Sequence, residues 1–322
     1  MNKNICAPNK YDSENDTCFS LDQVIELIKA FNKHITKINL SPTTKVSYDA
    51  TPIKISDNKS QMLTDLNNRF ISICSGKEMC LLKQDFMNEI VDKNMYNDIT
   101  TNTFRVKGPD GSTDWLSTID IDGIMHQYEE VYSDFHFLGA VPSDCDAVDY
   151  CVLHDINFDD ELNKGINRLG IIFNHDTHKQ SGSHWVSMFI DIPKATLYYV
   201  DSVGKDPVGR INKFIDTFKK YSENKGKKFV YKKNKFSYQT DDSECGIYSC
   251  NFLIRLLAGE SFEHIIENPL DFKAINSCRN IYFNNPISKA NAHKMCDPHI
   301  AKGGIVSNKS QTSKSKSKKS HF

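Results

Sequence analysis

The sequence predicts an α+β fold, in which a helical N-terminal part precedes a larger part that mixes strands and helices. Three observations support this. Apolar residues recur at helical spacing between residues 20 and 100. Short apolar runs of strand length follow residue 107, and two of them are joined by a turn sequence that contains Pro193. A largely apolar segment of helical length then begins at Cys245.

The first hundred residues predict a small helical domain. Residues 1–19 are polar and lack periodicity, so we expect them to be disordered. Ser20 and Gln23 have the spacing of a capping box, and the residues after them predict a helix to about Thr36. Residues 20–107 would form a helical arm whose apolar face packs on the rest of the chain or on a partner. Within it we expect a linker over residues 40–60 and further helices over residues 62–74 and 81–91.

A turn sequence at residues 107–112 marks the boundary of the second part. The sequence then predicts a helix that begins with Trp115 and continues through Tyr128. Apolar runs predict strands over residues 135–141, 169–173, 186–190 and 196–200. The last two read as a hairpin. Because its strands are antiparallel, His184 before the first strand and Asp201 after the second should emerge side by side.

The remainder of the chain predicts more helices, one short strand and a polar tail. We expect a helix over residues 208–221, a strand over 229–231 and a last helix over 269–283. The helix that begins at Cys245 is apolar around most of its circumference, so it should be buried, and Gly259 should end it. Residues 286–322 finish in a low-complexity basic segment that has too little apolar area to fold.

The composition is that of an ordinary globular protein, with 39% hydrophobic and 25% charged residues. No apolar run approaches the ~18 residues that span a bilayer, and no secretory signal is visible, so we expect an intracellular protein without membrane contact. Ten scattered cysteines favour reduced thiols. From Pro298 onward the tail has six lysines and no acids. It could bind nucleic acid or a capsid surface weakly, although a solvated terminus is the simpler interpretation.

Cys245, His184 and Asp201 together have the chemistry of a thiol nucleophile. A cysteine attacks as its thiolate, which a helix N-terminus and a nearby imidazolium both favour. His184 could take up the thiol proton and deliver it to a leaving amine, while Asp201 binds the other ring nitrogen. The amide of Gln239 and the backbone N–H of Cys245 could stabilise a developing oxyanion. Acidic neighbours such as Glu244 oppose thiolate formation unless they point to solvent.

No other motif predicts a metal or a cofactor. Cys145, Cys151 and His154 lie near one another, but their spacing fits no standard zinc-ligand pattern. The chain has no phosphate-binding loop, dinucleotide-binding glycine motif, HExxH motif or nucleophilic-serine elbow. We therefore expect neither a metal nor a cofactor.

The order and spacing of these residues resemble those of the ubiquitin-like-protein proteases. This family comprises the SUMO-specific proteases, the adenovirus protease and the capsid-maturation proteases of large DNA viruses. The resemblance covers residues 112–285. It rests on His184 followed by Trp185, Asp201 with Gly204 after a Tyr-rich strand, Gln239 shortly before Cys245 and Gly246, and a Trp-Leu element at Trp115 and Leu116.

The resemblance implies a papain-like cysteine protease core of the SUMO-protease and adenovirus-protease type. Such a core has a central mixed sheet flanked by helices and a catalytic cysteine at a helix N-terminus, to which an N-terminal helical domain is added here. Residues 112–285 would be the protease domain. The implied roles are His184, Asp201 and Cys245 as the catalytic triad, Gln239 in the oxyanion hole, and Trp185 with Trp115 as walls of a narrow tunnel that admits Gly-Gly.

Two departures from the SUMO-protease pattern bear on the substrate. Glu244 stands where these enzymes usually have Asp, and residues 1–105 match nothing in them. The added helices favour the viral branch, so we expect a thiol endopeptidase that cleaves viral precursors after Gly-Gly or Gly-x-Gly. It would act in the host cytoplasm and be packaged in the virion. The alternatives are an isopeptidase for SUMO or ubiquitin conjugates, a protein acetyltransferase of similar geometry, and a catalytically silent binding module.

Overall fold

The computed structural model describes residues 6–40, 46–111, 113–149, 151–284 and 293–298. At its centre is a five-stranded sheet in the order β1-β2-β3-β4-β5. The strands are β1 (Phe135–Pro142), β2 (Arg168–Asn174), β3 (Trp185–Asp191), β4 (Thr196–Val200) and β5 (Val230–Lys233). The outer pairs β1–β2 and β4–β5 are parallel, and the inner pairs are antiparallel. The α+β class with a mixed sheet is therefore confirmed.

The β3–β4 hairpin fixes the position of two predicted site residues. The side chain of Asp191 accepts a hydrogen bond from the turn backbone at 3.0 Å, and Ala195 adopts a left-handed conformation with φ of 50°. The register pairs Ser187 with Val200. Residues just before β3 and just after β4 consequently emerge at the same edge of the sheet, as the sequence predicts.

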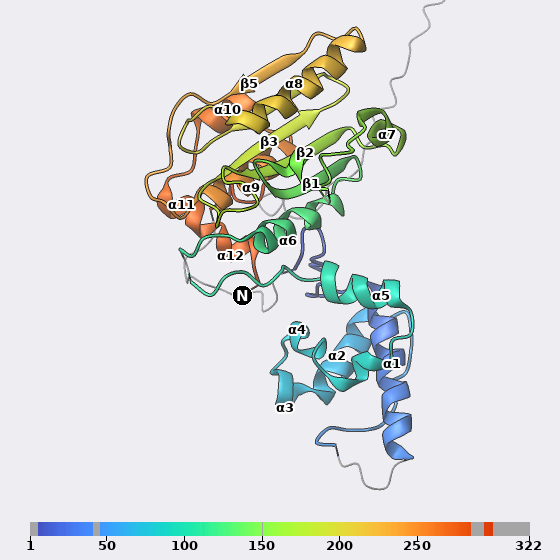
Figure 1. Cartoon of the computed structure of the whole chain (residues 1–322). Coiled ribbons are helices and arrows are strands. Elements are labelled where there is room, and N and C mark those ends of the chain that lie inside the picture. The colour runs from blue at the N-terminus through green and yellow to red at the C-terminus, as the bar shows by residue number, and fades with distance from the viewer. Residues whose placement is uncertain (1–5, 41–45, 112, 150, 285–292, 299–322) are drawn as a thin grey trace, which may run out of the picture.

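Helices cover both faces of the sheet (Figure 1). One face packs against α6 (Thr118–Glu129) and α9 (Cys245–Leu257), and the helices α10 (Phe262–Glu267), α11 (Phe272–Ser277) and α12 (Arg279–Tyr282) join the same hydrophobic core. The other face is covered by α7 (Phe158–Asn163) and α8 (Gly209–Asn224). A short 3-10 helix, η3 (Cys145–Ala147), follows β1. The arrangement encloses α9 between the sheet and its neighbouring helices.

α9 is buried along its whole length. All of its residues from Cys245 to Leu257 are buried, and it packs mainly on β3. It ends just before Gly259, whose φ of 90° suits the residue after a helix. The predicted buried helix is therefore confirmed. A helix held on all sides gives its first residue a fixed position.

Local capping sets helix boundaries that periodicity alone misplaces. Ser117 forms a capping box with Asp120, so α6 begins after Trp115 rather than at it. Asp271 caps α11, and the helix predicted over residues 269–283 is divided into α11 and α12. Helices α7 and α10 are too short to give a clear periodic signal. Among the described residues, no helix has the length and apolar character needed to cross a membrane.

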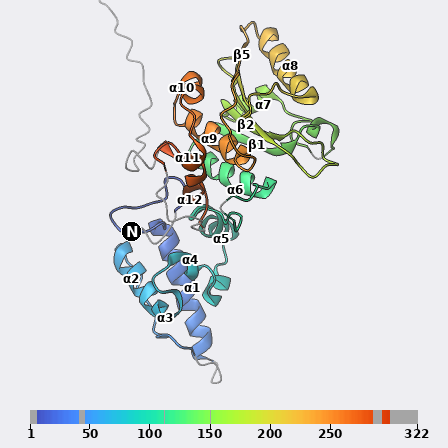
Figure 2. The same cartoon turned by 90° about the vertical axis from the view of Figure 1, so that its left-hand side faces the viewer.

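The N-terminal helices gather around a hydrophobic core of their own (Figure 2). The elements are α1 (Leu21–Asn39), α2 (Lys59–Arg69), α3 (Ile71–Cys74), α4 (Glu78–Leu81), α5 (Lys93–Asn97), the 3-10 helix η1 (Asp85–Glu89) and the π-helix η2 (Asp98–Asn102). The predicted capping box at Ser20 and Gln23 is present at the start of α1. Helices therefore occupy the first hundred residues largely as the periodicity indicates.

Two of the predicted N-terminal helices are interrupted. The helix over residues 62–74 breaks at Phe70, whose backbone leaves helical geometry while its ring packs against Phe86. Residues 81–91 form the end of α4 and then η1 rather than one helix. The side-chain amide of Gln84 donates to the Cys80 carbonyl at 2.9 Å, and such side-chain bonds compete with helix continuation.

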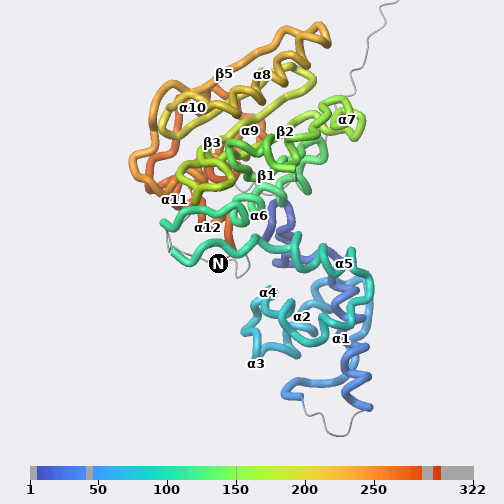
Figure 3. Tube along the Cα trace, in the orientation of Figure 1, coloured from blue at the N-terminus to red at the C-terminus, as the bar shows by residue number. Residues whose placement is uncertain are grey.

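Part of each predicted disordered terminus is folded. Residues 6–19 run between the N-terminal helices and the rest of the chain (Figure 3), and Cys18 is buried and bonded to Cys6. Residues 293–298 are also placed, and the buried carboxylate of Asp297 accepts a hydrogen bond from Arg105 at 2.8 Å. These long-range pairings have no local signature. The remaining tail residues, 286–292 and 299–322, lie outside the described residues.

The cysteines differ from the predicted reduced thiols. Eight of the ten form disulfides: Cys6–Cys18, Cys74–Cys80, Cys145–Cys151 and Cys278–Cys296. Cys245 and Cys250 are free, and both are buried. The prediction of reduced thiols is therefore wrong for eight cysteines. Each bonded cysteine pairs with a partner 6 to 18 residues away. The prediction considered only how widely the cysteines are spread along the chain and so missed these local pairs.

Candidate active site

Cys245, His184 and Asp201 lie together at one edge of the sheet. His184 immediately precedes β3, Asp201 immediately follows β4, and Cys245 is the first residue of α9. Nε2 of His184 lies 2.7 Å from Oδ1 of Asp201. This leaves Nδ1 of the ring for Cys245, whose thiol is among the groups that raise the pKa of His184. Three residues that the sequence separates by as many as 61 positions are thus brought into one site.

The environment of His184 favours its protonated form. Burial lowers the pKa of the ring, but the hydrogen bond to Asp201, the interaction with Cys245 and the charges of both residues outweigh burial and raise the pKa to about 9. Cys245 lies at the N-terminus of α9, where the helix dipole stabilises negative charge. An imidazolium and a helix N-terminus on one thiol favour a thiolate–imidazolium pair. Cys250 lies deeper in the same helix, and burial raises the pKa of its thiol.

Asn234 holds the backbone of Asp201 from both sides. Its Oδ1 accepts a hydrogen bond from the Asp201 N–H at 3.0 Å, and its Nδ2 donates to the Asp201 carbonyl at 2.6 Å. Asn234 is itself buried. Oδ1 of Asp201 also accepts from the backbone N–H of Val203 at 2.8 Å. The carboxylate is therefore aimed at His184 by contacts on both of its flanks.

Gln239 is tied to the segment that follows Asp201. The hydroxyl of Ser202 donates to Oε1 of Gln239 at 2.5 Å, and the Ser202 carbonyl accepts from the Gln239 backbone N–H at 3.0 Å. Nε2 of Gln239 donates to the Asp241 carbonyl at 2.6 Å. Because a primary amide has two N–H groups, one is left to face a developing oxyanion. One amide N–H of Gln239 is therefore committed to Asp241, and the role of the other N–H in an oxyanion hole stays a prediction.

Gly204 permits the close approach of the segment between β5 and Gln239. Its φ is 74°, and a Cβ at this position would lie 2.8 Å from the backbone of Phe236. Only glycine adopts this conformation without strain and leaves room for the neighbouring chain. The short motif from Asp201 to Gly204 thus fixes both the carboxylate behind the ring and the loop before the nucleophile.

The acidic residues that precede Cys245 are arranged so that they do not all oppose its thiolate. Asp241 and Asp242 are exposed to solvent. Glu244 is buried, and its Oε1 accepts hydrogen bonds from the hydroxyl of Ser243 and from Asn276.

A buried cation balances Glu244. Burial lowers the pKa of the Arg279 guanidinium, while the charges of Glu244 and Cys245 are among those that raise it. Electrostatic interaction is reciprocal, so the cation at Arg279 also favours negative charge on Cys245. Arg279 therefore offsets part of the repulsion that Glu244 exerts on the thiolate.

Trp185 and Trp115 lie in different environments. Trp185 is buried, and its indole N–H donates to the Leu116 carbonyl at 2.9 Å. Trp115 is 51% exposed. Leu116 also contacts the start of α9, because a Cβ on Gly246 would lie only 3.0 Å from the Leu116 Cβ. Gly246 thus lets Leu116, and with it the indole of Trp185, come close to the helix end that carries Cys245.

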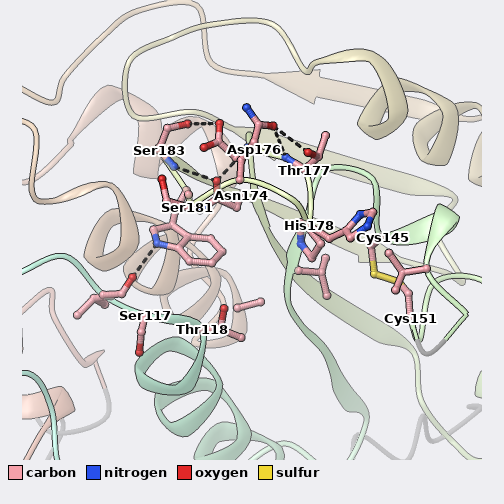
Figure 4. Close-up of a pocket in the computed structure, with 18 of the residues that line it drawn as sticks. Ser117, Thr118, Cys145, Cys151, Asn174, Asp176, Thr177, His178, Ser181 and Ser183 are labelled. Atoms are coloured by element: carbon pink, nitrogen blue, oxygen red, sulfur yellow. Dashed lines mark hydrogen bonds between the residues drawn. A yellow bond between two sulfur atoms is a disulfide. The ribbon is translucent and has the colours of Figure 1, made fainter.

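A cavity of about 770 Å³ opens beside the two tryptophans. Figure 4 shows the disulfide between Cys145 and Cys151 at one end of it and Ser181 and Ser117 toward the other. Neither His184 nor Cys245 is among its described lining residues. The cavity therefore adjoins the triad rather than containing it, and Trp185 forms the wall on that side.

The loop that precedes His184 forms one wall of this cavity. Oδ1 of Asn174 accepts from the backbone N–H groups of Asp176 at 2.9 Å and Ser183 at 3.1 Å, which closes the loop at its base (Figure 4). His178 reaches the opposite wall, where its Nδ1 lies 2.7 Å from Oδ2 of Asp144. The loops on the two sides of the cavity are thus joined.

The cysteines and histidine that lie near one another in the sequence do not form a metal site. Cys145 and Cys151 are bonded to each other, and His154 pairs with the adjacent Asp155. Within the described part of the chain, no group of three or more His, Cys, Asp or Glu side chains is arranged to hold a metal ion.

Comparison with known proteins identifies the family. The profile of the Ulp1 protease family, C-terminal catalytic domain, matches residues 159–285. A protein of Acanthamoeba polyphaga mimivirus that is named as a thiol protease is 50% identical over 297 residues, which cover 92% of this chain and 98% of the relative. The chain belongs to the Ulp1 protease family. This Ulp1-type enzyme is therefore a cysteine protease, and its core is of the predicted SUMO-protease type.

More distant relatives of the Ulp1-type enzyme are also viral. A SUMO-1 cysteine protease of African swine fever virus is 24% identical over 179 residues, or 51% of this chain and 65% of that protein. The crystal structure of the African swine fever virus protease has the same fold, with a TM-score of 0.58, 18% identity, and coverage of 76% of this chain and 96% of that one. The predicted relationship with proteases of large DNA viruses is thereby confirmed.

Several residues that support the site of this Ulp1-type enzyme carry no motif. Asn234 and Asn276 are asparagines among many, and only the fold brings them to Asp201 and Glu244. Arg279 has one indirect signal: the chain has 34 lysines and only six arginines. An arginine in so lysine-rich a chain is a candidate for a buried, multiply hydrogen-bonded position.

Proposed function

We propose that this thiol protease cleaves after Gly-Gly or Gly-x-Gly sequences in viral precursor proteins, and that Cys245, His184 and Asp201 are its catalytic triad. The observation that carries the proposal is the 2.7 Å contact between the His184 ring and the buried Asp201 carboxylate, together with the Cys245 thiol that interacts with the same ring from the start of α9. This is the arrangement that a thiol nucleophile, its proton carrier and the group that orients that carrier require.

The chemistry proceeds in two steps. The Cys245 thiolate attacks the scissile carbonyl carbon, and the oxyanion that forms is stabilised by the Cys245 backbone N–H and the free N–H of Gln239. His184 then donates its proton to the leaving amine, which leaves a thioester on Cys245. A water molecule, deprotonated by His184, hydrolyses the thioester and restores the thiolate–imidazolium pair.

The two tryptophans support specificity for glycine. The Trp185 indole is fixed by its hydrogen bond to Leu116, so it does not move aside easily for a substrate side chain. Trp115 presents a half-exposed indole on the same side. A chain that passes between two aromatic walls to reach Cys245 has room for glycine and little else, which is the reason for proposing Gly-Gly or Gly-x-Gly.

The cavity beside the tryptophans offers space for the residues that precede the glycines. Its volume of about 770 Å³ lies within the range of ordinary ligand sites and exceeds the needs of a single side chain. Val148 and Val152 supply apolar surface at the end near the Cys145–Cys151 disulfide. We propose that the substrate chain continues from the tryptophans into this cavity.

Cleavage of defined peptides tests the proposal. A peptide with Gly-Gly before the scissile bond should be cut by the intact protein, and replacement of either glycine by alanine should reduce the rate strongly. Cys245→Ala should abolish turnover. Cys250→Ala changes the other free cysteine of the same helix and should retain it. Failure of the fresh protein to cut any glycine-containing peptide, or activity that survives Cys245→Ala, contradicts the proposal.

A second candidate substrate is a conjugate of SUMO or ubiquitin. One viral relative is named as a SUMO-1 cysteine protease, which supports this alternative. A SUMO or ubiquitin probe with a C-terminal electrophile distinguishes the two substrates. Labelling of Cys245 by such a probe favours the isopeptidase, whereas cleavage of precursor peptides without labelling favours precursor processing.

The remaining parts of the chain also enter the proposal. We propose that the helices α1–α5 form an added domain that contacts a partner or the precursor, and that the basic tail after Pro298 contacts nucleic acid or the capsid weakly. Acting in the host cytoplasm and packaged in the virion, the enzyme would meet two redox environments. Disulfides persist better outside the reducing cytosol, so its four disulfides accord with the packaged form.

A further inference from the structure

Two buried polar atoms next to the triad face each other without hydrogen bonds. Nε2 of His175 and Oδ2 of Asp201 are both inaccessible to solvent, and neither has a hydrogen-bond partner. They lie 3.9 Å apart. A buried carboxylate oxygen without a partner is costly, because desolvation is not offset. The nearness of an unpartnered nitrogen to an unpartnered oxygen calls for a physical explanation.

The fold places His175 directly beside His184. β2 ends at Asn174, and the ladder between β2 and β3 continues for one more residue, since the His175 backbone N–H donates to the His184 carbonyl at 2.9 Å. The two rings are 5.0 Å apart between centroids and inclined at 66°. His175 therefore reaches Asp201 from the side that His184 leaves open.

The two oxygens of Asp201 have different surroundings. Oδ1 accepts from Nε2 of His184 at 2.7 Å and from the Val203 N–H at 2.8 Å. Oδ2 has only Nε2 of His175 within ion-pair distance among the described residues. An approach of about 1 Å would bring this contact to hydrogen-bond length.

We propose that His175 is a positioning residue of the active site, whose neutral ring donates a hydrogen bond from Nε2 to Oδ2 of Asp201 and thereby fixes the carboxylate that orients His184. This inference rests on the proposed triad. It adds a fourth side chain to the proposed triad, one that acts on the thiol only through Asp201 and His184.

The charged groups around His175 agree with a neutral ring. Burial lowers its pKa, and the positive charges of His184 and Lys205 act in the same direction. Asp201 and Asp176 oppose them, and the net shift is downward. Two adjacent imidazolium ions would repel each other, so the site holds one cation at His184 and one neutral donor at His175.

A hydrogen-bond donor on Oδ2 changes the attraction between Asp201 and the His184 cation as well as the orientation of the carboxylate. It takes up part of the carboxylate charge, which makes Asp201 a weaker partner for the His184 cation. Without this donor, the pKa of His184 should rise, and the ring should release its proton to the leaving amine more slowly. The carboxylate should also be less firmly oriented. Removal of the donor should therefore raise the upper pH limit set by His184 and lower kcat, with little effect on substrate binding.

Alkylation of Cys245 by iodoacetamide measures the thiolate–imidazolium pair without any substrate. Its rate is followed against pH by mass spectrometry for the wild type, His175→Leu and His175→Gln. The Gln side chain can place an amide N–H near the position of Nε2, whereas Leu cannot donate. His136→Leu serves as the matched control. His136 lies on β1 and also contacts a buried carboxylate, because its Nδ1 is 2.8 Å from Oε2 of Glu161.

Loss of the His184 proton changes the alkylation rate, and the pH at which this change occurs is the upper pH limit of the ion pair. We expect His175→Leu to raise this limit by about half a unit or more and to lower kcat about tenfold with KM little changed. His175→Gln and His136→Leu should stay close to the wild type. If the Leu variant does not fold, as judged by circular dichroism, His175→Asn replaces it, because its shorter amide does not reach the position of Nε2. An unchanged pH limit in the folded variant overturns the proposal, as does Gln behaving like Leu.

Tyr199 provides the rival explanation and its own variant. Its hydroxyl is buried without a hydrogen-bond partner, and its pKa is raised by burial and, to a smaller extent, by the charge of Asp201. If Tyr199→Phe reproduces the shift and His175→Leu does not, the donor is Tyr199 and the inference fails. If Cys245 of the wild type is not alkylated at pH values below those at which a free thiol reacts, the proposed triad itself is wrong. This outcome separates failure of the triad from failure of the role of His175.

Discussion

His184 and Asp201, 17 residues apart, meet at 2.7 Å because the β3–β4 hairpin brings the residue before one strand beside the residue after the other. The hairpin thus positions half of the triad by strand register alone. The other half depends on α9, which is buried on all sides and presents Cys245 at its first position. The hairpin and α9 therefore supply all three residues of the proposed triad, and the hydrophobic core between them fixes their relative position.

The two free cysteines should differ sharply in reactivity. Cys245 lies beside His184 at a helix N-terminus, whereas Cys250 is buried and its pKa is raised. Iodoacetamide at neutral pH should therefore alkylate Cys245 and leave Cys250 unmodified in the folded, unreduced protein. Peptide mapping by mass spectrometry identifies the modified residue. Equal modification of both cysteines would show that the site does not activate its thiol.

The activity should have an upper pH limit near 9. The pKa of His184 is raised from 6.5 to about 9, so the imidazolium is lost only as the pH approaches that value. The stability contributed by this cation is fully present below about pH 6.5 and is lost as the pH rises through about 9. A profile of kcat/KM against pH, with melting temperatures at the same pH values, measures both effects. A limit close to 7 would contradict this description of the site.

Asp201→Asn should move that limit downward. The substitution keeps the shape of the side chain but removes the charge that raises the pKa of His184. The limit should shift toward the ordinary histidine value of about 6.5, and kcat/KM at pH 8 should fall by about 10²-fold or more. Asp176→Asn is the control, because Asp176 is an acid of the same loop region that makes no contact with the His184 ring in the described structure. An unshifted limit in Asp201→Asn would exclude Asp201 as the orienting group.

Gln239→Ala should lower kcat more than it raises KM. One N–H of the Gln239 amide is available for the oxyanion, and the loss of one such donor costs about 10²–10³ in rate. Ser202→Ala removes only the hydroxyl that holds Oε1 of Gln239, so its effect should be smaller. Steady-state kinetics of the two variants on one peptide provide the comparison. A Gln239→Ala variant with wild-type kcat would place the oxyanion elsewhere.

The parts of the fold that could be predicted from the sequence are those with local causes. Periodicity predicts α1, α9 and the β3–β4 hairpin, and the hairpin predicts that His184 and Asp201 are adjacent. His184, Asp201 and Cys245 can be recognised in the sequence because they lie at the ends of predicted strands and at the start of a predicted helix. Each of these features depends on residues within about twenty positions.

The parts that could not be predicted depend on residues far apart in the chain. Asn234 clamps Asp201 from 33 positions away, and Arg105 pairs with Asp297 across 192 positions. No period or motif records such contacts, because they arise only when the elements pack. The disulfides belong to a different category: they join sequence neighbours, but the choice between thiols and disulfides is not encoded in spacing.

The Cys278–Cys296 disulfide should stabilise the protease core by attaching the C-terminal segment to it. Both cysteines are completely buried, and the bond holds the neighbouring Asp297 against Arg105. A bond that closes a loop of 18 residues is worth about 3 kcal/mol in the chain-entropy account.

The double variant with both Cys278 and Cys296 changed to Ala should therefore lose about 3 kcal/mol of its free energy of unfolding, measured by urea denaturation. The double variant with both Cys145 and Cys151 changed to Ala is the comparison. It removes a bond that closes a loop of only six residues and should lose about 2 kcal/mol. Equal stability of the first variant and the wild type, both measured without reductant, would mean that the segment around Asp297 is held by its ion pair alone.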